Sequence, residues 1–246
     1  MEWFEELYDD FRQRTGFGSI SDERTAHDVD FIVKMCALRP GDRVLDVCAG
    51  TGRHSIELER RGIRAIGFEL NPDYVRLALE RADNTGVAPS ITVGDVRTAE
   101  FGTGFHAAIL MWHSFGFFSD EQNLSLLAKI GRALRPEGRF VLEILNRDFL
   151  LRHFEPRAER VVDGIEVIEE RQFDISTSRI KSIITRREQS GAVVRRTNWR
   201  TYSLHELATM GTTAGLNLSA AYANLDEEPA DLDTRLMRLV FVRVGS

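Results

Sequence analysis

The sequence predicts an α/β protein with one parallel sheet and a smaller antiparallel β unit. Residues 41–150 alternate short apolar runs with amphipathic stretches, a rhythm typical of a parallel sheet covered by helices. Residues 151–202 break this rhythm, because long strand-like stretches follow one another with turn residues such as Asp163 and Gly164 between them. At 246 residues, the chain is long enough for one sizeable core and short for two full domains.

The first 40 residues are expected to form two helices. Apolar residues at helical spacing indicate the first, namely Trp3, Phe4, Leu7, Tyr8 and Phe11. Ser21 and Asp22 can cap the second helix, and Pro40 with Gly41 ends it.

Five strands are expected in the next region, at residues 43–47, 64–69, 91–93, 107–112 and 140–145. Asn71 and Pro72 are typical of a helix start after the second strand, and Ser119 with Gln122 forms a capping box after the fourth. Residues 135–138 are expected to form a turn before the fifth strand.

The rest of the chain is expected to return to the sheet after three antiparallel stretches. These stretches cover residues 161–173, 179–188 and 193–202. Ser203 and Glu206 then form a capping box for a helix that ends at Gly215. Two final strands are expected at residues 216–222 and 236–244.

Composition and charge exclude several classes of function. The formal charge of −6 argues against a phosphate-backbone partner, so no nucleic acid is expected. No stretch approaches the roughly 18 apolar residues of a membrane span, and the acidic start lacks the features of a signal peptide. We therefore expect a cytoplasmic protein without a membrane partner. Its two cysteines, Cys36 and Cys48, have no metal-binding spacing, and no side-chain cluster demands a metal.

The main candidate for chemistry is a glycine-rich turn between the first strand and the next helix. It runs from Asp46 to Gly52, and turns of this kind place a ligand at the carboxyl end of a sheet strand. Position 55 is Ser55 rather than the third glycine of a dinucleotide-binding turn, which disfavours a nicotinamide oxidoreductase. Glu69 ends the second strand, where a carboxylate can accept hydrogen bonds from ribose hydroxyls, and Asp95 follows the third.

Because it combines this turn with Glu69 and Asp95, the segment 41–246 resembles the class I S-adenosylmethionine-dependent methyltransferases. The resemblance implies a Rossmann-like seven-stranded methyltransferase sheet, with an N-terminal helical lid and an antiparallel β insertion after the fifth strand. It also implies S-adenosylmethionine as cofactor, with Glu69 at the ribose and Asp95 with Val96 at the adenine. Cys48 occupies the position of the first glycine of the family motif. The implied cofactor-binding residues are Asp46, Ala49, Gly50, Gly52, Glu69, Leu70, Asp95, Val96 and Met111.

The segment after the fourth strand narrows the resemblance. Residues 111–118 lack the Pro-Pro motif of many methyltransferases that act on bases or on protein glutamine, and look like those of bacterial small-molecule methyltransferases. This implies methyl transfer to nitrogen or oxygen of a small metabolite by in-line displacement, in a monomer or homodimer. Peptide or protein methylation and a non-catalytic cofactor-binding role remain alternatives.

One domain is expected, with residues 41–150 and 203–246 as the cofactor-binding core. Residues 1–40 are expected to form the helical lid, and residues 151–202 are expected to form the antiparallel β insertion.

Two residues are candidates for catalysis. His113 follows the fourth strand at the ligand edge and has an ordinary pKa near 6.5, which suits a general base. The alternative is that it only hydrogen-bonds the substrate or packs beside Trp112. Tyr8 can cover the cofactor and contact substrate, or can simply belong to an amphipathic face. Expected substrate contacts are His113, Asn146, Arg147, Arg200 and Tyr202.

Overall fold

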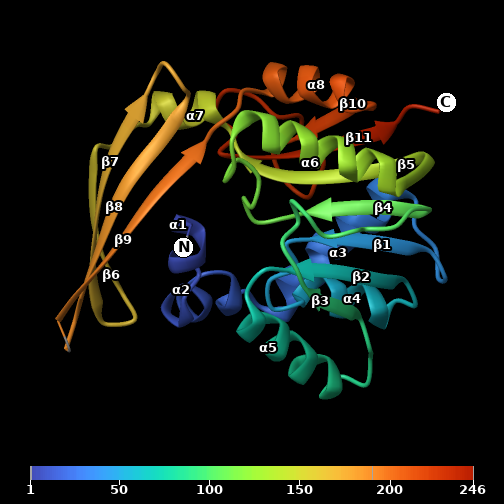
Figure 1. The fold of residues 1–246 in the computed structure, drawn as a ribbon, viewed down its shortest axis with the longest axis horizontal. Helices are drawn as coiled ribbons and strands as arrows, with labels where there is room; N and C mark the ends of the chain where they lie inside the picture. Colours follow the sequence, from blue (N-terminus) through green and yellow to red (C-terminus); the bar gives the residue numbers. More distant parts are fainter. Residues whose placement is uncertain (1, 190, 246) are drawn as a thin grey trace.

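The computed structural model describes residues 2–189 and 191–245 and contains two sheets (Figure 1). The large sheet consists of β1 (Arg43–Val47), β2 (Arg64–Glu69), β3 (Ser90–Val93), β4 (Phe105–Leu110), β5 (Leu134–Leu145), β10 (Leu216–Tyr222) and β11 (Leu236–Arg243). The small sheet consists of β6 (Arg157–Val162), β7 (Ile165–Asp174), β8 (Arg179–Glu188) and β9 (Gly191–Arg200).

The large sheet has the strand order β10-β11-β5-β4-β1-β2-β3. All neighbouring pairs from β3 to β5 are parallel, whereas β11 runs antiparallel to both β5 and β10. The small sheet, in the order β6-β7-β8-β9, is antiparallel throughout and follows β5 in the chain. The predicted fold class is therefore confirmed, including the insertion after the fifth strand.

Helices cover both faces of the large sheet because its central strands are apolar on both faces. Val44 and Ile109 pack in one cluster with residues of α3 (Asp22–Cys36) and α4 (Arg53–Arg60). Leu45 and Leu110 point the other way, toward residues of α6 (Asp120–Ala133) and α8 (Leu204–Thr213). Two further helices are α5 (Pro72–Asp83), between β2 and β3, and α7 (Arg147–Arg152), after β5. Among the residues described, no helix combines the length and apolar character that crossing a membrane requires.

The N-terminal segment contains more breaks than the sequence predicts. The single helix expected over its aromatic residues is wrong, because the structure has α1 (Trp3–Leu7) and α2 (Asp10–Thr15) instead. The Asp9 side chain accepts a hydrogen bond from the Arg12 backbone N–H at 3.0 Å, so Asp9 starts a new helix rather than continuing the first. A short 3-10 turn, Phe17–Ser19, leads toward α3.

These lid helices, α1 and α2, lie between the two sheets and are bonded to both (Figure 1). On the side of the small sheet, the Arg186 guanidinium forms two bonds of 3.1 and 2.7 Å with the Asp9 carboxylate. On the side of the large sheet, Asn71 donates to the Tyr8 carbonyl at 3.1 Å, and the Tyr74 hydroxyl donates to the Asp9 carbonyl at 3.1 Å.

Strand boundaries differ from expectation at two places, one at each edge of the large sheet. The turn expected at residues 135–138 lies inside β5 as an irregularity, where the pairing steps from Phe105↔Leu134 to Ala107↔Arg139. The strand expected at residues 107–112 ends at Leu110. Trp112 and His113 then adopt left-handed backbone angles, φ 63° and 61°, which turn the chain out of the sheet.

The end of the small sheet docks on the core at Gly116. The Gly116 carbonyl accepts a bond from the Arg200 backbone N–H at 2.8 Å, and a Cβ at position 116 would lie 2.2 Å from the Arg200 carbonyl oxygen. Its φ of +100° also disfavours any other residue.

We expect Gly116→Ala to lower the free energy of unfolding by about 3 kcal/mol or more, because overpacking adds to the cost of the left-handed backbone. Gly86→Ala is the matched control, since Gly86 has φ +72° but open space around it, and should cost about 1 kcal/mol. Urea unfolding followed by circular dichroism measures both. Equal losses in the two variants would contradict this account of the junction.

Candidate functional site

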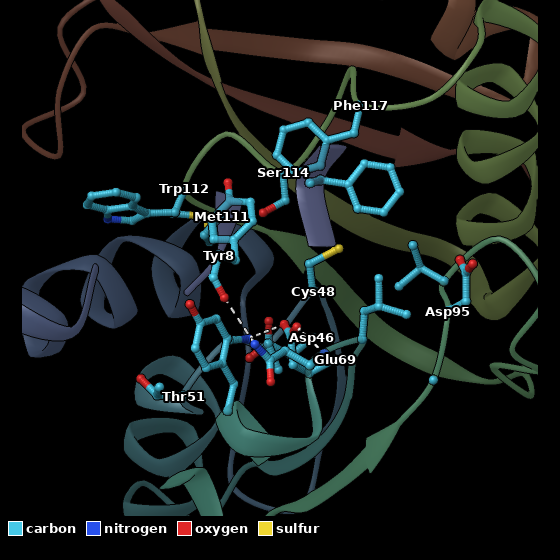
Figure 2. A pocket seen from close by; sticks show the side chains of 18 of the residues that line it. Tyr8, Asp46, Cys48, Thr51, Glu69, Asp95, Met111, Trp112, Ser114 and Phe117 are labelled. Carbon is cyan, nitrogen blue, oxygen red and sulfur yellow. Dashed lines mark hydrogen bonds between the residues drawn. The ribbon is translucent and has the colours of Figure 1, made fainter. Parts of the chain in front are cut away.

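A cavity of about 450 Å³ lies at the carboxyl edge of the large sheet (Figure 2). Its walls come from the ends of β1, β2, β3 and β4, from α1 and from Tyr8, which follows α1. The volume is within the range of small-molecule sites. The cavity is lined by residues that include Phe4, Tyr8, Asp46, Cys48, Ala49, Gly50, Arg53, His54, Glu69, Leu70, Tyr74, Asp95, Val96, Met111, Trp112, Ser114, Phe117 and Phe118.

The glycine-rich turn forms the floor of this cavity. Cys48, Gly50 and Gly52 all have left-handed φ angles, of 64°, 56° and 72°, so the chain curls tightly into α4. Gly52 lies outside the lining and packs against α5. A Cβ there would come within 2.8 Å of Ala78 and of Ile91. Gly50 and Ala49 line the cavity, as the sequence predicts for a ligand-facing turn. Cys48 therefore occupies a position whose left-handed backbone favours glycine.

Glu69 connects the end of β2 to this turn. Its Oε2 accepts the Gly50 backbone N–H at 2.9 Å, and its Oε1 accepts the Asn71 N–H at 2.9 Å. The Leu70 backbone N–H also donates to this carboxylate. An ionised carboxylate has about four acceptor positions, so Glu69 keeps acceptor capacity for a ligand hydroxyl. Burial raises the pKa of Glu69, while the backbone hydrogen bonds act in the opposite direction.

Asp46 lies in β1 beneath the turn and is almost fully buried. Its carboxylate accepts one hydrogen bond from the Ser55 hydroxyl, at 2.7 Å. Burial raises its pKa to about 6, although the Ser55 bond and the charge of Arg53 lower it. A positively charged ligand group above Asp46 would therefore be stabilised by a carboxylate with a single hydrogen-bond partner among the described residues.

Asp95 lines the far end of the cavity but is already held by a cation. Arg97 donates to both Asp95 oxygens through its side chain, at 2.7 to 3.1 Å, and its backbone N–H adds a bond of 2.8 Å. Although burial raises the pKa of Asp95, this pairing lowers it more. Arg97 also bonds Glu2 at 2.6 Å and lies over the Phe118 ring. Few acceptor positions remain on Asp95, so backbone groups of Val96 gain importance for any base bound here.

Aromatic side chains close the cavity from the lid side. Phe4 stacks on Phe117 with ring centroids 5.9 Å apart, and Tyr8 lies against the same ring at 5.9 Å. Tyr8, Met111, Trp112 and Ser114 gather at the side away from Asp95 (Figure 2). Burial raises the pKa of Tyr8, so its hydroxyl stays protonated at neutral pH and is a donor rather than a base.

His113 is absent from the cavity lining, although its neighbours Trp112 and Ser114 belong to it. Burial lowers its pKa to about 4, and the charges of Arg235, Arg12 and Arg238 act in the same direction. The imidazole is therefore neutral at pH 7, and its lowered pKa makes it a weaker proton acceptor than an ordinary histidine. Its Nδ1 atom is buried without a hydrogen-bond partner.

The other four predicted substrate residues also lie outside the cavity lining and form hydrogen bonds or ion pairs with residues of the protein. Asn146 caps α7 and donates to the Thr234 carbonyl at 3.1 Å. Arg147 and Arg200 share Glu206, at 2.5 and 2.7 Å. The fully buried Tyr202 hydroxyl accepts a bond from Asn123 at 2.9 Å. These residues join the small sheet to the core, and their predicted contact with substrate has no counterpart in the cavity.

Several features near the cavity escape sequence reasoning. Arg53 lines the cavity and forms a buried ion pair with Asp28 of α3 at 2.7 Å. His54 lies 3.5 Å from the same carboxylate. Tyr74 and Ser114 also line the cavity. The pairing of Asp28 with Arg53 joins residues 25 positions apart, and the sequence contains no signal for it.

Metal-binding chemistry has no obvious location in residues 2–189 and 191–245, where no group of three or more His, Cys, Asp or Glu side chains is arranged to hold an ion.

Comparison with known proteins identifies similarities at two levels. A family model described as a methyltransferase domain matches residues 44–138. A glycine/sarcosine N-methyltransferase from Halorhodospira halochloris is 27% identical over 135 residues, which cover 54% of this chain and 50% of that protein. The chain thus spans about half the length of the curated relatives it matches.

Solved structures match nearly the whole chain. The CcbJ methyltransferase from Streptomyces caelestis has a TM-score of 0.81 at 18% identity and covers 99% of this chain and 97% of its own. An amino pentose methyltransferase from Micromonospora echinaspora, solved with S-adenosylmethionine bound, has a TM-score of 0.70 at 21% identity and covers 99% and 98%. At these identities the likeness establishes the fold.

The pKa of Asp46 predicts a pH dependence of stability. Between its ordinary value of 3.8 and about 6, the unfolded chain releases this proton before the folded protein does, so the wild type loses stability as pH rises through that window. Asp46→Asn keeps the shape and an acceptor for Ser55 without the charge. We expect it to gain up to about 3 kcal/mol relative to wild type between pH 4 and pH 7.

Urea unfolding at both pH values measures this gain, with Asp83→Asn, an exposed acid, as control. A stability difference between Asp46→Asn and wild type that stays constant from pH 4 to pH 7 would contradict the assignment.

Proposed function

We propose that this chain, which carries a methyltransferase domain on the class I S-adenosylmethionine-dependent methyltransferase fold, binds S-adenosylmethionine in the cavity and methylates nitrogen or oxygen of a small metabolite. The observation that carries the proposal is the arrangement of Glu69 at the end of β2, bonded to the glycine-rich turn, on the wall of a cavity of about 450 Å³. This is the edge at which open α/β sheets bind their ligands.

The residues present fit this cofactor. Glu69 keeps acceptor capacity for a ribose hydroxyl beside its three backbone partners. Asp46, with a raised pKa and a single partner, suits an ammonium group. Val96, Leu70 and Phe118 offer an apolar setting for a base beside Asp95. Gly52 shapes the turn without lining the cavity, so its predicted cofactor contact becomes a packing role in this proposal.

S-adenosylmethionine supplies a methyl group on a positively charged sulfur. The protein's task is to hold the acceptor atom in line with that methyl and to exclude water. Phe4, Tyr8 and Phe117 form the apolar cover that excludes water. A protonated Tyr8 hydroxyl donates a hydrogen bond, and neutral His113 accepts a proton from the acceptor group.

The position of the lid helices favours a small acceptor over a peptide. They lie between the two sheets and bond to each of them, so the cavity is covered rather than open along a groove. The single-domain division with a lid and an insertion, the cytoplasmic location, the absence of nucleic-acid partners and the monomeric or homodimeric state stay predictions.

Replacing Glu69 by Ala should weaken binding of S-adenosylhomocysteine about tenfold or more, because charge-assisted hydrogen bonding to the ribose is lost. Isothermal titration calorimetry measures the dissociation constants. Glu23→Ala, which removes an exposed carboxylate from α3, is the control and should leave them unchanged. Wild type that binds no S-adenosylhomocysteine would overturn the proposed function, and unchanged affinity in Glu69→Ala would remove Glu69 from the site.

For His113, we expect His113→Gln to lower the methyl-transfer rate by about 10²-fold or more throughout pH 6–9, since a general base contributes at least this much. The loss should be independent of pH in this range, because a pKa of about 4 keeps the wild-type imidazole neutral. His205→Gln, on the exposed face of α8, is the control. A His113→Gln enzyme with full rate at every pH would rule out the base.

A further inference from the structure

Arg97 connects the start of the lid to the far end of the cavity. Its guanidinium bonds the carboxylate of Glu2, the residue before α1, at 2.6 Å. It also lies over two aromatic rings that line the cavity, 5.6 Å from the Phe4 centroid and 4.8 Å from the Phe118 centroid. The Arg97 side chain is 21% exposed, so these contacts are partly shielded from water and stronger than those of a free surface charge.

The remaining donors of Arg97 are directed at Asp95. Its Oδ1 accepts from the Arg97 backbone N–H and Nε, at 2.8 and 3.1 Å, and its Oδ2 accepts from Nε and Nη2, at 2.9 and 2.7 Å. An ionised carboxylate has about four acceptor positions, and this single residue engages both oxygens twice. A ligand amine would therefore bond Asp95 only by displacing part of the Arg97 contact.

Backbone acceptors at this end of the cavity are engaged as well. The Asp95 carbonyl accepts the backbone N–H groups of Thr98 and Ala99, at 3.0 and 2.7 Å. The Val96 carbonyl accepts the Lys129 ammonium at 2.9 Å. The protein thus supplies its own donors to the acceptors of residues 95 and 96, and what these residues offer a base is mainly apolar surface.

The contact of Arg97 with the lid differs in kind from the other contacts between lid and core. The segment between α1 and α2 is held by two neutral hydrogen bonds to its backbone carbonyls. The start of α1 is held by a bond between two charges, and such bonds are roughly twice as strong as neutral ones. Phe4, two residues after Glu2, packs edge-on against Phe118 with ring centroids 5.4 Å apart. Arg97 therefore fixes the end of the lid that carries Phe4.

We propose that Arg97 is a positioning residue that holds Phe4 and the start of the lid over the adenine of the cofactor, and that Asp95 orients Arg97 rather than accepting the exocyclic amine of adenine. The proposal rests on the proposed function, because it concerns the same cofactor in the same cavity. Adenine is then held by apolar contact with Val96 and Phe118. In this respect the chain departs from the role that its resemblance to the methyltransferases implies for Asp95.

The first experiment compares S-adenosylhomocysteine with its purine riboside analogue, which lacks the exocyclic amine, by isothermal titration calorimetry. We expect the two dissociation constants of the wild type to agree within about threefold, whereas losing a hydrogen bond to an ionised carboxylate would weaken binding about tenfold or more. Asp95→Ala should weaken both ligands by the same factor, about three- to tenfold, because Arg97 loses its orientation. A preference of about tenfold or more for S-adenosylhomocysteine in the wild type that disappears in Asp95→Ala would overturn this role of Asp95.

The second experiment measures backbone hydrogen exchange of residues 5–8 by mass spectrometry, on the full chain without ligand. Arg97→Gln and Glu2→Gln should each speed this exchange about three- to tenfold, since each removes the charged contact at the start of the lid. Arg97→Lys keeps a charge opposite Glu2 and should speed it less. The matched control is Glu6→Gln, which removes an exposed carboxylate from the same helix and should change nothing.

Thermal unfolding checks that each variant folds. Unchanged exchange in both Arg97→Gln and Glu2→Gln, or equal acceleration in Glu6→Gln, would overturn the role of Arg97 at the lid.

The outcome is separable from that of the proposed function. Failure of S-adenosylhomocysteine to bind would refute the methyltransferase proposal, while hydrogen exchange in the ligand-free protein would still test the contact between Arg97 and the lid. Normal S-adenosylhomocysteine binding, with a preference for the exocyclic amine that depends on Asp95, would refute the present inference alone.

Discussion

The hydrogen bond from the Gly50 backbone to the Glu69 carboxylate is the contact on which the site depends. It joins the tight turn after β1 to the end of β2 at 2.9 Å, and so fixes the floor of the cavity against its wall. The turn needs left-handed backbone angles at every second position from 48 to 52, and the first of these is occupied by Cys48 rather than glycine. Such a strained turn persists when its surroundings hold it, and here Glu69 and the packing of Gly52 on α5 do so.

The second determinant is the position of the lid helices between the two sheets. Asp9 both starts α2 and binds Arg186 of the small sheet, while its carbonyl accepts the Tyr74 hydroxyl beside the cavity. The same short segment therefore covers the cavity and attaches the insertion.

The sequence predicts the core well because parallel strands bring their carboxyl ends to one edge. Asp46, Glu69 and Asp95 are far apart in the chain, yet all line one cavity for this reason. The sequence predicts the surroundings of the residues outside the cavity less well. Arg147 and Tyr202 also follow strands, but their partners Glu206 and Asn123 come from helices whose packing no local pattern encodes.

Transfer of a labelled methyl group from S-adenosylmethionine into a metabolite extract of the native cell tests the central claim most directly. We expect mass spectrometry to find the label in a compound of low molecular mass, and we expect Glu69→Ala to reduce the formation of that compound. Label confined to the protein fraction, or none at all from a protein that binds S-adenosylhomocysteine, would contradict it.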